Sequence, residues 1–157
     1  LLQSHENHFN MARPGIAIYG ISPIQAQHNL RSAMIVKAPL CLIKNIKKGT
    51  SIGYNRAYIA EEDLRIGMIQ IGYGDAVPFE LSNKDCVEFQ GKRMDVLGQV
   101  SMDLLCIRLD DNKISIGDDV TVFGGDVTGI ARIARQNNLS PYSILTGVSS
   151  RVRRIYK

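Results

Sequence analysis

The feature that most constrains the fold is a series of short apolar segments that begins at residue 33 and continues to residue 123. Most of them alternate apolar and polar residues, and turn residues separate one from the next, at the spacing of roughly 8 to 12 residues that is typical of all-β domains. The pattern therefore predicts a mainly β domain, built as a sandwich or a barrel. We expect strands at residues 33–45, 51–60, 64–73, 86–90, 93–97, 100–109 and 119–123.

Two further segments lie outside this series. Residues 127–137 place apolar side chains at helical spacing, with Asp126 or Thr128 as a cap at the start, and they predict one short helix. Residues 16–19 are a short apolar run that we expect to be a strand. A change of composition near residue 21 predicts a boundary between a small N-terminal part and the β domain.

Composition limits the classes of function and partner. The chain has 157 residues, of which 45% are hydrophobic and 22% charged, as in an ordinary globular protein. The net charge of +4 is modest and only 6% of the residues are aromatic, so we expect no nucleic-acid partner. No run approaches the roughly 18 apolar residues of a membrane span. The three cysteines, Cys41, Cys86 and Cys106, lack the spacing of metal ligands, so we expect no metal site. Their apolar surroundings indicate buried free thiols and therefore a cytoplasmic protein.

The segment 72–75, Gly-Tyr-Gly-Asp, ends one of the expected strands. Two glycines free the backbone on either side of one phenol, and an aspartate favours a turn. The cluster is therefore either an ordinary turn with a half-buried tyrosine or an arrangement that holds the hydroxyl of Tyr73 for chemistry. The polar motifs at 13–16, 101–103, 141–142 and 151–154 have ordinary structural explanations as well.

The order of the motifs is more informative than any one of them. RPGIAIYG, GTSIGY, IGYGD, LGQVSMD and SPYSILTGVSSRVRRIY follow one another over almost the whole chain. This series resembles the second half of an alanine racemase, a family that uses pyridoxal 5′-phosphate. The resemblance implies that residues 1–30 are the end of an N-terminal (β/α)8 barrel, including its last strand, and that residues 31–157 form a C-terminal β domain. It also implies a cytoplasmic homodimer with shared active sites and a small amino acid, alanine, as substrate.

The resemblance also assigns roles to individual residues. Tyr73 corresponds to the catalytic tyrosine, which works on the substrate face opposite the cofactor lysine, so that two bases exchange the α-proton. Arg13 corresponds to the arginine that donates to the pyridine nitrogen of the cofactor. That nitrogen must then remain an acceptor, because a guanidinium is a donor only. The remaining assignments are Gly15, Ile16 and Tyr142 to the cofactor phosphate, and Met102 to the substrate carboxylate, with Asp103 as its supporting neighbour.

The resemblance has gaps. The lysine that carries the cofactor has no counterpart, so we expect the chain to be one part of an enzyme and to be inactive alone. Gln99 and Arg153 stand where an arginine and a proline are common in the family. Three functions remain open: an alanine racemase that provides D-alanine for peptidoglycan synthesis, a racemase for serine or another small amino acid, against which Tyr142 argues, and a non-catalytic β domain that acts in dimerisation.

Overall fold

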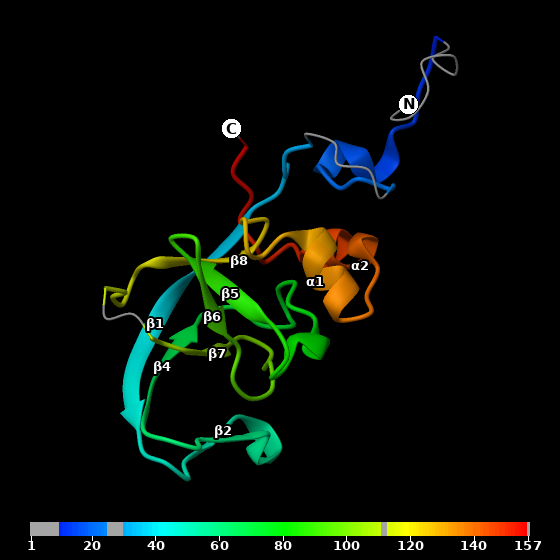
Figure 1. The fold of residues 1–157 in the computed structure, drawn as a ribbon. Helices are drawn as coiled ribbons and strands as arrows, with labels where there is room; N and C mark the ends of the chain where they lie inside the picture. The colour runs from blue at the N-terminus through cyan, green and yellow to red at the C-terminus, as the bar shows by residue number, and fades with distance from the viewer. Residues whose placement is uncertain (1–9, 25–29, 111–112, 157) are drawn as a thin grey trace. The chain divides into compact units, whose positions relative to one another are not determined.

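The computed structural model describes residues 10–24, 30–110 and 113–156, whose course is drawn in Figure 1. The chain divides into two compact units, Leu1–Met34 and Ile35–Lys157. The larger of them, called the β unit, contains all the strands of the described residues. No helix in the described part of the chain is long and apolar enough to cross a membrane.

The β unit is built on one antiparallel sheet of six strands in the order β6-β5-β8-β1-β4-β7. Val96, which follows β6, pairs with Ile107 of β7, and the amide of Leu97 donates to the carbonyl oxygen of Cys106 at 2.9 Å. Because these contacts join the two edge strands, the sheet closes into a small barrel. The predicted mainly β fold is confirmed. The six strands are β1 (Val36–Ile46), β4 (Leu64–Ile69), β5 (Cys86–Phe89), β6 (Lys92–Asp95), β7 (Leu105–Arg108) and β8 (Asp119–Phe123).

Strand β1 is long and curved, and it joins the two halves of the sheet (Figure 1). Its first part pairs with β8 and its second part with β4, with a shift of register between Leu40 and Leu42. Cys41 lies at this irregularity and is exposed, and its thiol donates to the carbonyl oxygen of Met68 at 3.2 Å. The prediction of buried thiols is therefore wrong for Cys41, although the other two cysteines are buried.

The prediction of one continuous strand at residues 51–60 is wrong. The segment forms a short hairpin of β2 (Ser51–Ile52) and β3 (Tyr58–Ile59), with a 3-10 turn at Tyr54–Arg56 between them. Gly53 has a φ of 76° and Asn55 a φ of 55°. Residues in this left-handed region reverse the chain instead of continuing an extended strand.

The predicted helix is present as α1 (Ile130–Gln136), but its start differs from the expectation. Gly129 is the N-cap and makes no side-chain cap bond. The hydroxyl of Thr128 instead accepts a hydrogen bond from the amide of Gly125 at 3.1 Å, which closes the turn before the helix. The side chain that we expected to cap the helix is thus used one turn earlier in the chain.

The expectation of a single helix is wrong, because α2 (Pro141–Gly147) follows α1. Ser140 caps α2 by accepting from the amide of Tyr142 at 3.3 Å. Pro141 occupies the start of the helix, where a missing N–H leaves no acceptor unsatisfied. A serine followed by a proline is a known start signal for a helix, so this element was predictable from its residues.

Helix α1 is attached to the sheet through a buried aspartate that precedes β5. Asp85 is 1% exposed, and its carboxylate accepts from Nη2 of Arg132 at 2.8 Å and from Nδ2 of Asn137 at 2.5 Å. The amide of Cys86 also donates to it at 2.8 Å. These four residues are called the Asp85 cluster. They fix α1 against β5, and α2 packs on α1.

Residues 16–19, predicted to be a strand, instead belong to a 3-10 helix at Gly15–Tyr19 in the smaller unit. Its hydrogen bonds are local: the amide of Ala17 donates to the carbonyl oxygen of Pro14 at 3.3 Å, and that of Gly20 to Ala17 at 3.0 Å. An apolar run becomes a strand only where a neighbouring strand satisfies its backbone groups. Here the two bonds are turn bonds between residues three apart, as in a 3-10 helix.

Candidate active site

Two loops leave the sheet side by side, one after β4 and the other before β7. The last residue of β4 pairs with the first residue of β7, so both loops start at the same end of the sheet. The amide of Tyr73 donates to the carbonyl oxygen of Ser101 at 2.9 Å, and that of Gly74 donates to Met102 at 3.0 Å. We call residues 72–75 the tyrosine loop and residues 101–104 the methionine loop. Tyr73 and Met102, assigned to separate roles, thus lie on adjoining loops.

Gly72 explains why glycine precedes the tyrosine. A Cβ atom at this position would lie 2.1 Å from the carbonyl oxygen of Ser101 and 2.4 Å from that of Met102. Only glycine therefore allows the two loops to approach so closely. The amide of Gly72 donates to Oδ2 of Asp75 at 3.0 Å, and the amide of Asp75 donates back to the carbonyl oxygen of Gly72 at 3.0 Å. Two hydrogen bonds in opposite directions between Gly72 and Asp75 therefore close this turn.

The side chain of Tyr73 projects from this turn and is 54% exposed. Its backbone is held by the turn, while about half of the Tyr73 side chain remains accessible. Met102 on the methionine loop is also about half exposed. That loop is closed by Ser101, whose hydroxyl donates to the carbonyl oxygen of Leu104 at 2.8 Å and accepts from its amide at 3.0 Å. Both loops therefore present side chains from a fixed backbone.

An arginine from the C-terminal tail joins the two loops. Nε and Nη2 of Arg151 donate to Oδ1 of Asp75 at 3.0 and 2.8 Å, and Nη2 also reaches Oδ1 of Asp103 at 2.6 Å. The two carboxylates raise the pKa of Arg151, with the bond to Asp103 as the larger cause. The side chain of Arg151 is 45% exposed, so this residue of the basic tail is accessible to solvent and ion-paired at the same time.

The residues expected to hold a cofactor lie in both units. Tyr142 is on α2 with an exposed ring, and Arg13 is exposed in the smaller unit. Gly15 has a φ of 58°, which glycine adopts freely. The amides of Gly15 and Ile16 precede the first bond of the 3-10 helix, which Ala17 makes, so the helix gives them no acceptor. A guanidinium, a phenol and backbone N–H groups are hydrogen-bond donors, which a ring nitrogen and a phosphate can accept from.

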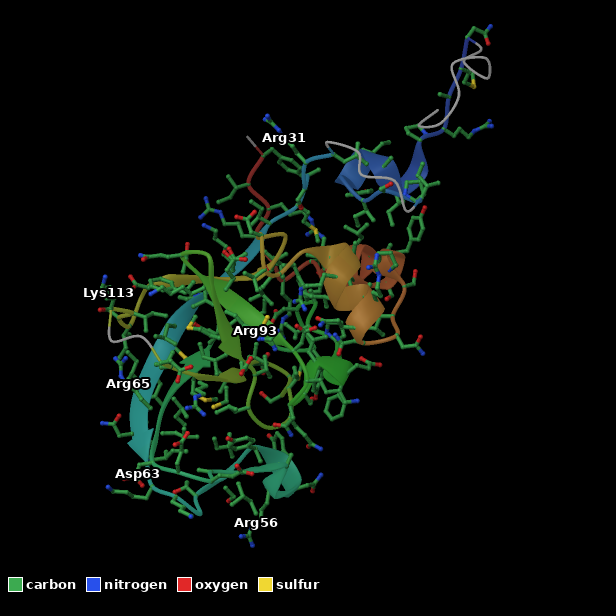
Figure 2. The ribbon with its side chains drawn as sticks, in the orientation of Figure 1. Arg31, Arg56, Asp63, Arg65, Arg93 and Lys113 are labelled. Atoms are coloured by element: carbon green, nitrogen blue, oxygen red, sulfur yellow. The ribbon has the colours of Figure 1, made fainter. Side chains whose placement is uncertain are left out.

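Charged side chains elsewhere on the β unit are spread over different elements. Figure 2 labels four of them: Arg56 in the 3-10 turn, Arg65 on β4, Arg93 on β6 and Lys113 before β8. Among the residues that the structure describes, no group of three or more His, Cys, Asp or Glu side chains could hold a metal ion. The paired loops are therefore the better candidate for chemistry.

Comparison with known proteins agrees with the motifs. The family model described as the alanine racemase C-terminal domain matches residues 33–156. The chain belongs to the alanine racemase family.

Two curated alanine racemases illustrate the extent of the similarity. That of Vesicomyosocius okutanii is 39% identical over 153 residues, which are 97% of this chain and 44% of that protein. That of Yersinia pestis is 33% identical over 161 residues, or 99% of this chain and 45% of that protein. The chain thus spans less than half the length of these alanine racemases.

Solved alanine racemases share the fold. The crystal structure of the Bartonella henselae enzyme with covalently bound pyridoxal phosphate has a TM-score of 0.84 and 31% identity, over 91% of this chain and 40% of that one. The biosynthetic enzyme of Pseudomonas aeruginosa also has a TM-score of 0.84, with 32% identity over 91% of this chain and 41% of that one. The described β fold is that of the alanine racemase C-terminal domain.

Sequence reasoning found some of the alanine racemase positions that the structure brings together and missed others. Tyr73 and Met102 were assigned and lie on adjoining loops. Arg151 was missed as a member of the site, because its partners Asp75 and Asp103 are 76 and 48 residues away. The only indication in the sequence was that Arg151 lies in the last of the motifs that resemble the family.

Proposed function

We propose that this chain is the C-terminal part of a pyridoxal 5′-phosphate-dependent enzyme that interconverts L- and D-alanine by two-base proton transfer. Residues 1–30 would then be the end of its N-terminal barrel and residues 31–157 its C-terminal β domain. The observation that carries the proposal is the accessible phenol of Tyr73 on a turn hydrogen-bonded to the loop of Met102. Membership of the family and the order of the motifs support it.

Tyr73 has the proton-transfer role in this proposal. Racemisation requires that a proton leaves the α-carbon on one face and that another arrives on the opposite face. Two bases on opposite sides achieve this directly, and each contributes through its position. Tyr73 takes or returns the proton on one face, and the base for the other face comes from the rest of the enzyme. The amide of Met102 binds the substrate carboxylate beside it.

Four residues of the chain hold the cofactor in the proposal. When bound, pyridoxal 5′-phosphate supplies the electron sink that makes the α-proton acidic. Arg13 donates to its ring nitrogen, and because a guanidinium does not give up its proton, that nitrogen stays an acceptor. The amides of Gly15 and Ile16 and the hydroxyl of Tyr142 donate to its phosphate. The active form is a homodimer in which each site combines residues of two subunits.

The test uses the full-length enzyme that contains this chain. We expect it to racemise L-alanine faster than L-serine, and Tyr73→Phe to reduce kcat by about 10²- to 10⁴-fold, because the variant lacks the proton carrier. Tyr54→Phe removes a more exposed phenol from the turn between β2 and β3 and serves as the control. Full activity of Tyr73→Phe would refute the role of this residue. Faster turnover of L-serine would change the substrate.

A further inference from the structure

Arg151 is placed differently from the other arginines of the β unit, because its two carboxylate partners come from the two site loops. Its Nε and Nη2 donate to Oδ1 of Asp75, and Nη2 is shared with Oδ1 of Asp103. The Asp75 side chain is 14% exposed, whereas that of Asp103 is 60% exposed. One guanidinium thus joins an almost buried carboxylate of one loop to an accessible carboxylate of the other.

Each carboxylate is connected to a residue of the proposed site. Asp75 uses its other oxygen, Oδ2, to accept from the amide of Gly72, so the same side chain closes the turn that carries Tyr73. Asp103 follows Met102 directly in the chain. A movement of the guanidinium would therefore be transmitted to both sides of the site.

The guanidinium also packs on the tyrosine loop. A Cβ atom built at Gly74 would lie 3.2 Å from both Nη1 and Nη2 of Arg151 and 3.1 Å from the carbonyl oxygen of Met102. The amide of Ser149, two residues before the arginine, donates to the carbonyl oxygen of Asp75 at 2.8 Å. The tail is thus held to the loop by its backbone as well as by its charge.

We propose that Arg151 is a positioning residue, which fixes the loop of Tyr73 relative to the loop of Met102 so that the phenol and the carboxylate-binding amide meet the same substrate. This inference rests on the proposed function. The Arg151 side chain is 45% exposed, and ion pairs of an accessible charge contribute little to stability, so the contribution of Arg151 lies in geometry. A displacement of a reacting group by about 1 Å can reduce a rate by about 100-fold.

The first test compares backbone protection without substrate. In the full-length enzyme, Arg151→Met should increase amide hydrogen exchange in peptides that cover the tyrosine and methionine loops, because the amides of Tyr73 and Gly74 bond across them. Arg108→Met is the matched control, since Arg108 also bridges two carboxylates, Asp110 at 2.7 Å and Glu62 at 2.9 Å. It should leave exchange in both loops unchanged.

The second test measures kinetics with α-deuterated L- and D-alanine. Arg151→Met should lower kcat by about 10- to 100-fold and increase the primary isotope effect for the enantiomer whose proton Tyr73 removes. A purely structural role would lower the fraction of active enzyme and leave the isotope effects of both enantiomers unchanged. Arg151→Lys keeps the charge without the planar fork and should restore activity in part. Asp103→Asn removes one carboxylate and should give a smaller change of the same kind.

The outcomes separate this inference from the proposed function. If Tyr73→Phe is inactive while Arg151→Met retains wild-type kcat and isotope effects, the positioning role is wrong and the proposed function stands. Unchanged exchange in both loops of Arg151→Met would equally overturn the positioning role. A wild-type enzyme that racemises no amino acid would overturn both.

Discussion

Two arginines of the β unit contact aspartates from distant parts of the chain, and their surroundings differ. Arg132 of α1 reaches Asp85, whose side chain is fully buried, and the Asp85 cluster fixes the helices to the sheet. Arg151 reaches Asp75 and Asp103 in a partly exposed setting at the end of the sheet. A buried charge that loses its partner is strongly destabilising, whereas an exposed pair contributes little to stability. The same chemistry therefore anchors helices in one region and orients loops in the other.

The largest effect is expected from removal of the buried carboxylate. Asp85→Ala should lower the free energy of unfolding by about 3–5 kcal/mol, because it removes the buried carboxylate that accepts from Arg132, from Asn137 and from the amide of Cys86. Oδ1 of Asn137 already lacks a hydrogen-bond partner in its buried position. Urea denaturation of the wild type and the variant measures the difference. A loss below about 1 kcal/mol would mean that the Asp85 cluster is not the anchor.

Gly72→Ala tests the close approach of the two loops. The added methyl group meets backbone atoms of Ser101 and Met102, so we expect a loss of about 1–3 kcal/mol together with separation of the loops. Gly129→Ala is the control, since a Cβ atom there would lie 3.8 Å from the carbonyl oxygen of Gly125, an ordinary van der Waals distance. Equal stability of Gly72→Ala and the wild type would show that the loops can move apart without cost.

Alkaline pH should lower the stability that the buried Cys106 thiol contributes to the barrel core and leave the ion pairs of Arg151 intact. Burial raises the pKa of the Cys106 thiol from its ordinary value of 9.0 to about 12. The thiol of the unfolded chain ionises first. The contribution of the buried, neutral thiol to the free energy of unfolding is therefore fully present below pH 9 and decreases up to about pH 12, by about 1.4 kcal/mol per pH unit. Cys106→Val should flatten the decrease measured by urea denaturation at several pH values. The charge of Arg151 persists through this range, because its carboxylate partners raise its pKa.

The smallest effect on stability is expected at Arg151 and its carboxylate partners Asp75 and Asp103. Arg151→Met should leave the urea midpoint close to that of the wild type, even though it slows turnover in the full enzyme. A midpoint as low as that of Asp85→Ala would contradict the contrast between the two regions. In that case Arg151 would be an anchor of the fold and not a positioning residue.

Local chemistry predicted much of the fold. The hairpin of β5 and β6 turns at Gln90 and Gly91, which have φ values of 51° and 78°, one residue earlier than the expected strands 86–90 and 93–97 implied. The run at 16–19 was predicted wrongly, because its apolar residues carry no information about whether a neighbouring strand exists. Cys41 was placed in the core by its apolar context, and the irregular register of β1 exposes it.

The amino-acid sequence by itself determined most of the strands of the barrel and which family the motifs resemble, because both depend on residues close together in the chain. The tertiary structure alone decided which distant polar side chains meet. Arg151 lies 76 residues from Asp75, and Arg132 lies 47 residues from Asp85. Such contacts follow from the order and pairing of the strands, and the order β6-β5-β8-β1-β4-β7 cannot be obtained from local hydrophobic patterns.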